Sequence, residues 1–154
     1  MKINEISDCS IKVLMTWFTN QEELTRWAGP GFNYPFSFNS FKTSLNLSAS
    51  CSYSLSSDED ELLAFAQYSL RLNRIHLARI VINPDFRGQG LVKQLITRLL
   101  IKAKSEFKVN QCSLFVFADN HSAISAYQKL GFSLAKYPET LPAKDCLFMV
   151  KSLP

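Results

Sequence analysis

Residues 80–92 read IVINPDFRGQGLV, and this stretch says most about the fold. A strand-like apolar run, Ile80–Ile82, is followed by a turn that contains proline and by two glycines that open a long helical pattern. Backbone N–H groups in such a loop and in the first turn of a helix lack intrahelical partners, and the helix dipole adds positive potential. The stretch therefore predicts an anion site, where Gly88 and Gly90 let a phosphate approach the backbone and Arg87 adds a positive charge.

The spacing of these glycines excludes two common phosphate-binding loops. The dinucleotide fingerprint needs a third glycine where Lys93 stands. The nucleoside-triphosphate loop needs Gly-Lys followed by Ser or Thr, and the chain contains no such string.

Apolar periodicity divides the rest of the chain into strands and helices. We expect strands at residues 2–6, 62–70, 75–82, 112–118, 132–137 and 146–151, of which the second and third form a hairpin. We expect helices within residues 10–28, in two pieces divided at 19–20, and at residues 40–47, 91–107 and 122–130. The serine-rich segment 48–57 is either a strand or a mobile connection. This alternation predicts a mixed α/β sheet covered on both faces, in a single domain over residues 1–154.

Composition narrows the class of protein further. No apolar run is long enough to cross a bilayer, which favours a soluble, cytoplasmic protein without a membrane partner. The net charge of +4 is spread along the chain, so nucleic acid is not an expected partner. The cysteines form no CxxC pair, so no metal site is predicted, and Cys112 and Cys146 are expected in the core, with a catalytic thiol as the alternative.

A second motif lies at residues 120–132 and supports a family resemblance. In the glycine loop, Arg87, Gly90 and Val92 follow the order Arg or Gln, two residues, Gly, one residue, then Gly or Ala, although valine replaces the small residue. The second motif resembles N-x-x-A-x-x-x-Y-x-x-x-G-F at Asn120, Ala123, Ala126, Tyr127, Lys129, Leu130, Gly131 and Phe132. In order and spacing, the two motifs together resemble the acetyl-CoA-dependent N-acetyltransferases of the GNAT superfamily.

The resemblance implies a mostly antiparallel mixed sheet that splays between strands 75–82 and 112–118. It also implies acetyl-CoA as the acyl donor, with its pantetheine arm in the splay. The residues expected to bind this cofactor are Ile80, Val81, Ile82, Arg87, Gly88, Gln89, Gly90, Leu91, Val92, Asn120 and Lys129.

Two residues are candidates for proton transfer. Tyr127 matches the tyrosine that protonates the departing CoA thiolate in many family members, and the alternative is a core aromatic. Strand 76–82 carries no carboxylate to act as a general base, which leaves His76 as the candidate base or as a structural residue. A base is dispensable for an α-amine, which is partly neutral at pH 7.

These patterns predict direct attack of a primary amine, small molecule or protein N-terminus, on acetyl-CoA in a ternary complex. A module that keeps the fold and binds CoA or a protein without turnover stays open, as does a homodimer. Several aromatic rings surround the loop at residues 29–38, and they line the acceptor pocket or close the core: Trp27, Phe32, Tyr34, Phe36, Phe38 and Phe41.

Overall fold

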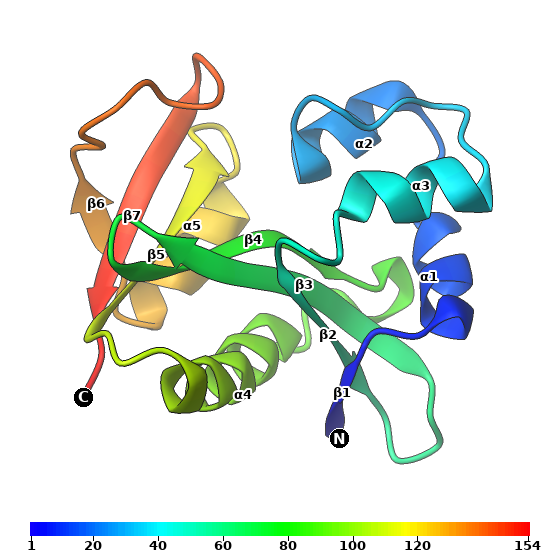
Figure 1. Cartoon of the computed structure of the whole chain (residues 1–154), viewed down its shortest axis with the longest axis horizontal. Coiled ribbons are helices and arrows are strands. Elements are labelled where there is room, and N and C mark those ends of the chain that lie inside the picture. The colour runs from blue at the N-terminus through cyan, green and yellow to red at the C-terminus, as the bar shows by residue number, and fades with distance from the viewer.

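The fold is described from a computed structural model that covers residues 1–154. A seven-stranded sheet runs through the molecule in the order β1-β2-β3-β4-β5-β7-β6 (Figure 1). Its strands are β1 (Lys2–Glu5), β2 (Cys51–Ser56), β3 (Leu62–Arg71), β4 (Arg74–Ile82), β5 (Gln111–Phe117), β6 (Ser133–Ala135) and β7 (Cys146–Ser152). Every neighbouring pair is antiparallel except β4 and β5, which are parallel. The mixed, mostly antiparallel sheet is as predicted.

The helices begin and end close to the positions that the sequence predicts. They are α1 (Asp8–Met15), α2 (Gln21–Ala28), α3 (Phe38–Leu45), α4 (Leu91–Glu106) and α5 (His121–Lys129), with one turn of 3-10 helix at Pro84–Phe86. Asn20 begins α2, because its side chain accepts a hydrogen bond from the Glu23 N–H at 2.8 Å. No helix is long and apolar enough to span a bilayer.

The serine-rich segment whose structure the sequence left open contains strand β2. It pairs with β3 from Cys51↔Tyr68 to Ser56↔Leu62, and it is buried along most of its length. The β3–β4 hairpin turns at Leu72 and Asn73, whose φ angles of 49° and 58° place both in the left-handed region that two-residue hairpin turns require.

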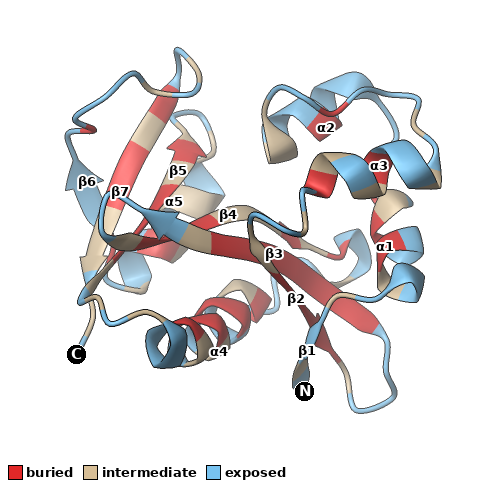
Figure 2. Ribbon diagram, in the orientation of Figure 1, coloured by how far each residue is buried: buried red, intermediate tan, exposed pale blue.

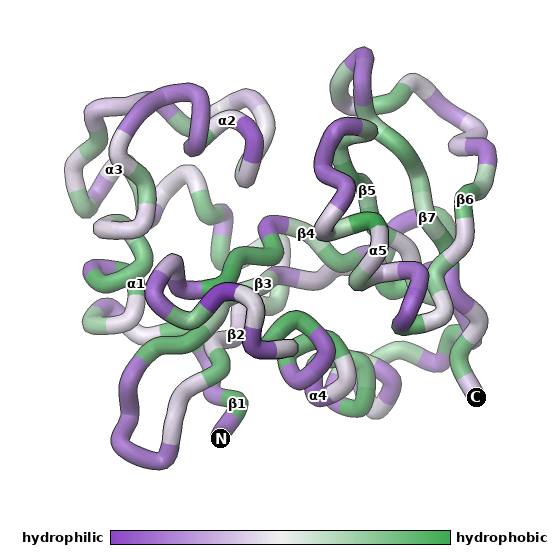
Figure 3. The backbone as a smooth tube through the Cα atoms, turned by 180° about the vertical axis from the view of Figure 1, so that it is seen from behind, coloured by the Kyte–Doolittle hydropathy of each residue, from purple (hydrophilic) through white to green (hydrophobic).

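Helices cover both faces of the sheet, as predicted. The amphipathic α4 and the Tyr127 face of α5 pack with residues of β2–β5 into one core cluster. Figure 2 colours the buried residues of α4 and of the central strands red, and Figure 3 shows hydrophobic stretches in the same elements. On the other face, α1, α2 and α3 form a second cluster over three residues of β3 and β4, namely Leu62, Phe65 and Val81. Most of the aromatic rings near residues 29–38 belong to this second cluster, with Phe32 and Phe41 buried, so they close the core beneath the loop.

The parallel strands β4 and β5 separate midway along their length, which confirms the predicted splay. They pair only from Ile75↔Cys112 to Leu77↔Leu114, although β4 continues to Ile82 and β5 to Phe117. Where they separate, β4 bulges: its register with β3 moves from Gln67↔Ala78 to Phe65↔Val81, and Arg79 adopts a φ of 51°. The strand edge beyond Leu77 therefore has no partner on the β5 side.

Candidate active site

The loop between β4 and α4 has the geometry of an anion site. Gly88 and Gly90 have φ angles of 76° and 74°, a region that favours glycine, and a Cβ on either would meet no atom within 4 Å. The N–H groups from Arg87 to Lys93 donate no hydrogen bond within the protein, and no side chain caps α4 at Gly90. A row of free donors at the positive end of a sixteen-residue helix suits phosphate oxygens.

Asn83 holds this loop against the start of β3. Its backbone N–H donates to Leu63 O at 2.8 Å and its side-chain amide donates to Leu62 O at 2.9 Å. Its side-chain oxygen accepts from the Asp85 N–H at 3.0 Å and so begins the 3-10 turn. Asn83 is buried, and these contacts fix the position from which the glycine loop starts.

The remaining residues expected at the cofactor lie beside this loop. Ile80, Val81 and Ile82 form the part of β4 that β5 leaves unpaired. Arg87 and Gln89 are exposed, and the Arg87 guanidinium makes no ion pair. Leu91 and Val92 pack into or against the core, so the valine side chain is accommodated by packing and its N–H stays free.

The second motif places two further residues at the start and end of α5. The Asn120 side-chain oxygen caps the helix by accepting from the Ala123 N–H at 3.4 Å, while its amide N–H₂ group has no partner. Lys129 in the last turn is exposed.

Tyr127 faces the core from α5, yet its hydroxyl keeps contact with solvent. The ring is 7% exposed and packs edge-on against Phe132, with centroids 6.0 Å apart. The Tyr127 hydroxyl makes no hydrogen bond within the protein. The Arg98 Nε is the one side-chain polar atom that is both inaccessible to solvent and without a partner, so the Tyr127 hydroxyl is accessible to solvent. Burial raises the pKa of Tyr127 to about 12, so the phenol holds its proton at neutral pH.

His76 lies where β4 and β5 are still paired. It is 3% exposed, its Nδ1 is 2.9 Å from Ser113 Oγ, and the Phe115 ring packs edge-on at 4.7 Å. Burial, and secondarily the charge of Arg71, lowers the pKa of His76 to about 4. The histidine is thus neutral and enclosed, which favours its structural interpretation. Cys112 and Cys146 are buried as expected, and burial raises the pKa of both thiols.

The structure adds a residue that the sequence motifs did not indicate, Arg79 at the bulge. Its side chain turns toward the α1–α3 face, where Nη1 donates to Gln67 Oε1 at 2.7 Å and to Leu45 O at 3.3 Å. Its guanidinium carbon lies 5.0 Å from the centre of the Phe32 ring. Trp27 holds the bulge by donating from Nε1 to Arg79 O at 2.8 Å. In the sequence, the feature that could have indicated Arg79 is its charge within an otherwise apolar strand.

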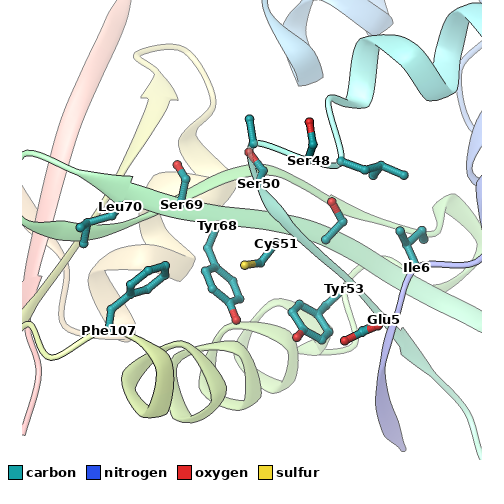
Figure 4. Close-up of a pocket in the computed structure, with 13 residues that line it drawn as sticks. Glu5, Ile6, Ser48, Ser50, Cys51, Tyr53, Tyr68, Ser69, Leu70 and Phe107 are labelled. Atoms are coloured by element: carbon teal, nitrogen blue, oxygen red, sulfur yellow. The ribbon is translucent and has the colours of Figure 1, made fainter.

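A separate hollow of about 410 Å³ lies beside β2 and β3 (Figure 4). It is lined by β2, β3 and the end of α4, including Cys51, Tyr53, Tyr68 and Phe107. The Tyr68 hydroxyl donates to Glu106 at 2.9 Å. No residue of either motif lines this hollow, so it is distinct from the candidate site.

A splayed mixed sheet with a phosphate-suited loop at the start of α4 is the architecture of acyl-CoA-dependent acyltransferases. A family model described as the acetyltransferase (GNAT) family matches residues 21–132. The chain belongs to this family.

Two curated relatives match the chain over part of their lengths. The ribosomal protein bS18-alanine N-acetyltransferase of Salmonella typhimurium is 31% identical over 96 residues, which cover 59% of this chain and 64% of the relative. The probable spermine N(1)-acetyltransferase of Bacillus subtilis subsp. natto is 30% identical over 82 residues, covering 48% of this chain and 54% of the relative. The matches thus span less than two thirds of either relative.

Solved structures share the fold over nearly the whole chain. The crystal structure of the Escherichia coli ribosomal-protein-S18-alanine N-acetyltransferase superposes with a TM-score of 0.70 at 24% identity, covering 99% of this chain and 93% of that one. The Vibrio cholerae spermidine N-acetyltransferase, solved with CoA and spermine, superposes with a TM-score of 0.77 at 16% identity, covering 98% and 94%.

Proposed function

We propose that this chain transfers an acetyl group from acetyl-CoA to a primary amine within a ternary complex. The observation that carries the proposal is the row of free N–H donors from Arg87 to Lys93, which directly follows the unpaired edge of β4. Acetyl-CoA supplies an activated acyl group, two bridging phosphates and an extended chain. The free donors suit its phosphates, and the open edge from Ile80 to Ile82 suits the amide groups of its chain.

Further groups from the second motif would hold the same donor. The free amide N–H₂ of Asn120 and the exposed ammonium of Lys129 both lie on α5, and Arg87 adds a charge with no competing carboxylate. These contacts orient the donor so that its acyl end lies between the two separating strands.

Tyr127 is assigned as the proton donor. The amine nitrogen forms a bond to the acetyl carbon, the carbon–sulfur bond breaks, and the amine releases a proton to water. Tyr127 gives its proton to the departing sulfur and recovers one from solvent, with which its hydroxyl keeps contact. We assign no base role to His76, because it is enclosed and lies on the paired part of β4.

Calorimetry with acetyl-CoA and CoA, followed by a thiol-release assay over a panel of amines, tests this function. The proposal expects saturable binding and thiol release that depends on an amine. Binding without release on any amine would instead favour a CoA-binding module without turnover, and no binding would contradict the proposal outright.

A further inference from the structure

Arg79 is a half-buried cation without an anionic partner. All four ion pairs of the structure involve other residues. Its two hydrogen bonds go to neutral oxygens, on Gln67 and Leu45. Burial alone lowers the pKa of Arg79, since no carboxylate nearby opposes the effect. A desolvated charge that is bonded only to neutral groups is stabilised when an anion binds to it.

The hydrogen bonds of Arg79 leave one edge of its guanidinium free. Both bonds to the protein come from Nη1, while Nε and Nη2 have no partner and are not sealed from solvent. Nε and Nη2 together form the side-on edge of the fork, whose two parallel N–H groups match the two oxygens of a carboxylate. Phe32 supports the guanidinium from its face, so the free edge is held in one orientation.

Arg79 lies next to the place where the proposed reaction would occur. It stands at the bulge, two residues after Leu77, which is the last residue of β4 paired with β5 before the strands separate. Its side chain lies on the face covered by α1–α3, opposite the face on which α4 packs. Its φ of 51° is uncommon for a side chain of this size, and such backbone strain is frequent at functional sites.

No carboxylate is paired with Arg79. The acidic residues of the helices on its face are otherwise placed: Glu23 of α2 accepts from the Thr19 N–H at 3.0 Å, and Glu22 is exposed. Residues 27–57 include no Asp or Glu, and their one charged residue, Lys42, pairs with Asp8. Strands β3 and β4 also lack acidic residues. Asp119, nearer the end of β5, is already paired with Arg26. A polyamine would bring several positive charges toward a cation that no carboxylate neutralises.

We propose that the acceptor is a small amine that also carries a carboxylate, which binds the free edge of Arg79; this rests on the acetyl transfer proposed above. The carboxylate would anchor the molecule at the bulge and leave its amine free to reach the acetyl group. A carboxylate fits this edge because its two coplanar oxygens match the parallel N–H groups of Nε and Nη2.

The test compares matched acceptors on the unaltered chain by thiol release. One pair is alanine and alaninamide, and another is 2,4-diaminobutyrate and 1,3-diaminopropane, which lacks the carboxylate. Spermine and an alanine-initiated peptide, tested with free and with amidated carboxylates, complete the panel. We expect kcat/KM to be about tenfold to a hundredfold higher with the carboxylate in each pair, as for a charge-assisted hydrogen bond. The amide's less basic amine biases the first pair against this result.

Substitution then assigns the preference to one side chain. Arg79→Gln should remove it by raising KM for the carboxylate acceptors, while the other member of each pair and the affinity for CoA change little. Arg74→Gln is the matched control, because Arg74 lies on the same strand, 5.9 Å from the Phe148 ring centre, and donates to Gln111 at 2.8 Å. It sits at the paired end of β4 and should keep the preference.

The outcomes separate the two proposals. Equal or greater activity of the uncharged acceptors, spermine or the amidated peptide in the unaltered chain would overturn the carboxylate assignment and leave acetyl transfer standing. A peptide with free carboxylates that outperforms every small acceptor would overturn the small-molecule source. If no amine is acetylated, the thermal stability of the protein with CoA and 2,4-diaminobutyrate is measured instead. A stabilisation that Arg79→Gln abolishes would support the carboxylate site at Arg79 and refute acetyl transfer. The absence of that stabilisation would refute both.

Discussion

The guanidinium of Arg26 on α2 donates two hydrogen bonds, of 2.9 and 3.2 Å, to the carboxylate of Asp119 just beyond β5. The same guanidinium lies 5.1 Å from the centre of the Phe117 ring. The pair is separated by 93 residues in the chain and connects the α1–α3 layer with the strand that leaves β4. It therefore bridges the two sides of the splay, on the face where we propose that the acceptor binds.

We predict that Arg26→Gln raises KM for the acceptor amine several-fold and changes the affinity for CoA little. The pair is exposed, so it should matter more for the position of α2 than for global stability. Asp119→Asn should have the same effect, and the double variant should be no worse than either single one. Strictly additive effects, or no change in KM, would contradict a bridging role.

Gly90→Ala should weaken CoA binding, and the loss of affinity should exceed what the loss of folding stability accounts for. Gly29→Ala is the control, since its φ of 71° is also positive and neither glycine has an atom within 4 Å of an added Cβ. Gly90 is in the left-handed region, where alanine costs about 1–2 kcal/mol, whereas Gly29 (ψ −164°) is in a region nearly confined to glycine, so the control loses at least as much stability. Only the Cβ at Gly90 would stand among the free N–H donors. Thermal melts and calorimetry with CoA on both variants check this, and equal CoA affinities would remove the loop from the site.

Tyr127→Phe should lower turnover on the order of a hundredfold and leave CoA binding nearly intact. The ring would still pack against Phe132, while the proton donor would be lost. Tyr137→Phe serves as the control, because Tyr137 is equally buried but receives its hydrogen bond from Arg71. Single-turnover kinetics should separate the two variants. Full activity of Tyr127→Phe across the pH range would disprove the assignment.

His76 should make the folded state sensitive to acid. Its pKa of about 4 lies below the unfolded value of 6.5, so the unfolded chain binds the extra proton first. Stability should therefore fall as the pH drops from 6.5 to 4, by up to about 3 kcal/mol.

Urea unfolding at several pH values measures this slope. His76→Asn should flatten it, whereas the exposed His121→Asn should retain it. If His76→Asn abolished turnover in a folded protein while the slope persisted, His76 would be catalytic after all.

Local patterns predicted most of the fold, because periodicity and turn residues act over a few positions. The glycine loop and the starts of α2 and α5, which Asn20 and Asn120 cap in the structure, belong to this class. Strand β2 was ambiguous because its alternate residues are serines, and the structure buries Ser52 and Ser54 between neighbouring strands. Serine composition alone does not distinguish a buried strand from a linker.

Contacts between distant segments could not be predicted from one sequence. The charge of Arg79 is evident in the sequence. That it bonds only to neutral groups depends on Leu45 and Gln67, which come from two other elements. His76 offered a suitable intrinsic pKa, and only its burial against Ser113 and Phe115 places that pKa too low for a base at neutral pH. Both outcomes arise from tertiary packing.

The most direct test of the account is an amide NMR titration of the ¹⁵N-labelled chain with CoA. We expect the largest shifts on the N–H groups from Gly88 to Lys93, which are free in the unbound protein. Smaller shifts should appear from Ile80 to Ile82, and amides around the hollow at Cys51 and Tyr68 should stay unchanged. If CoA instead shifted the amides around that hollow and left residues 88–93 unaffected, the proposed site would be wrong.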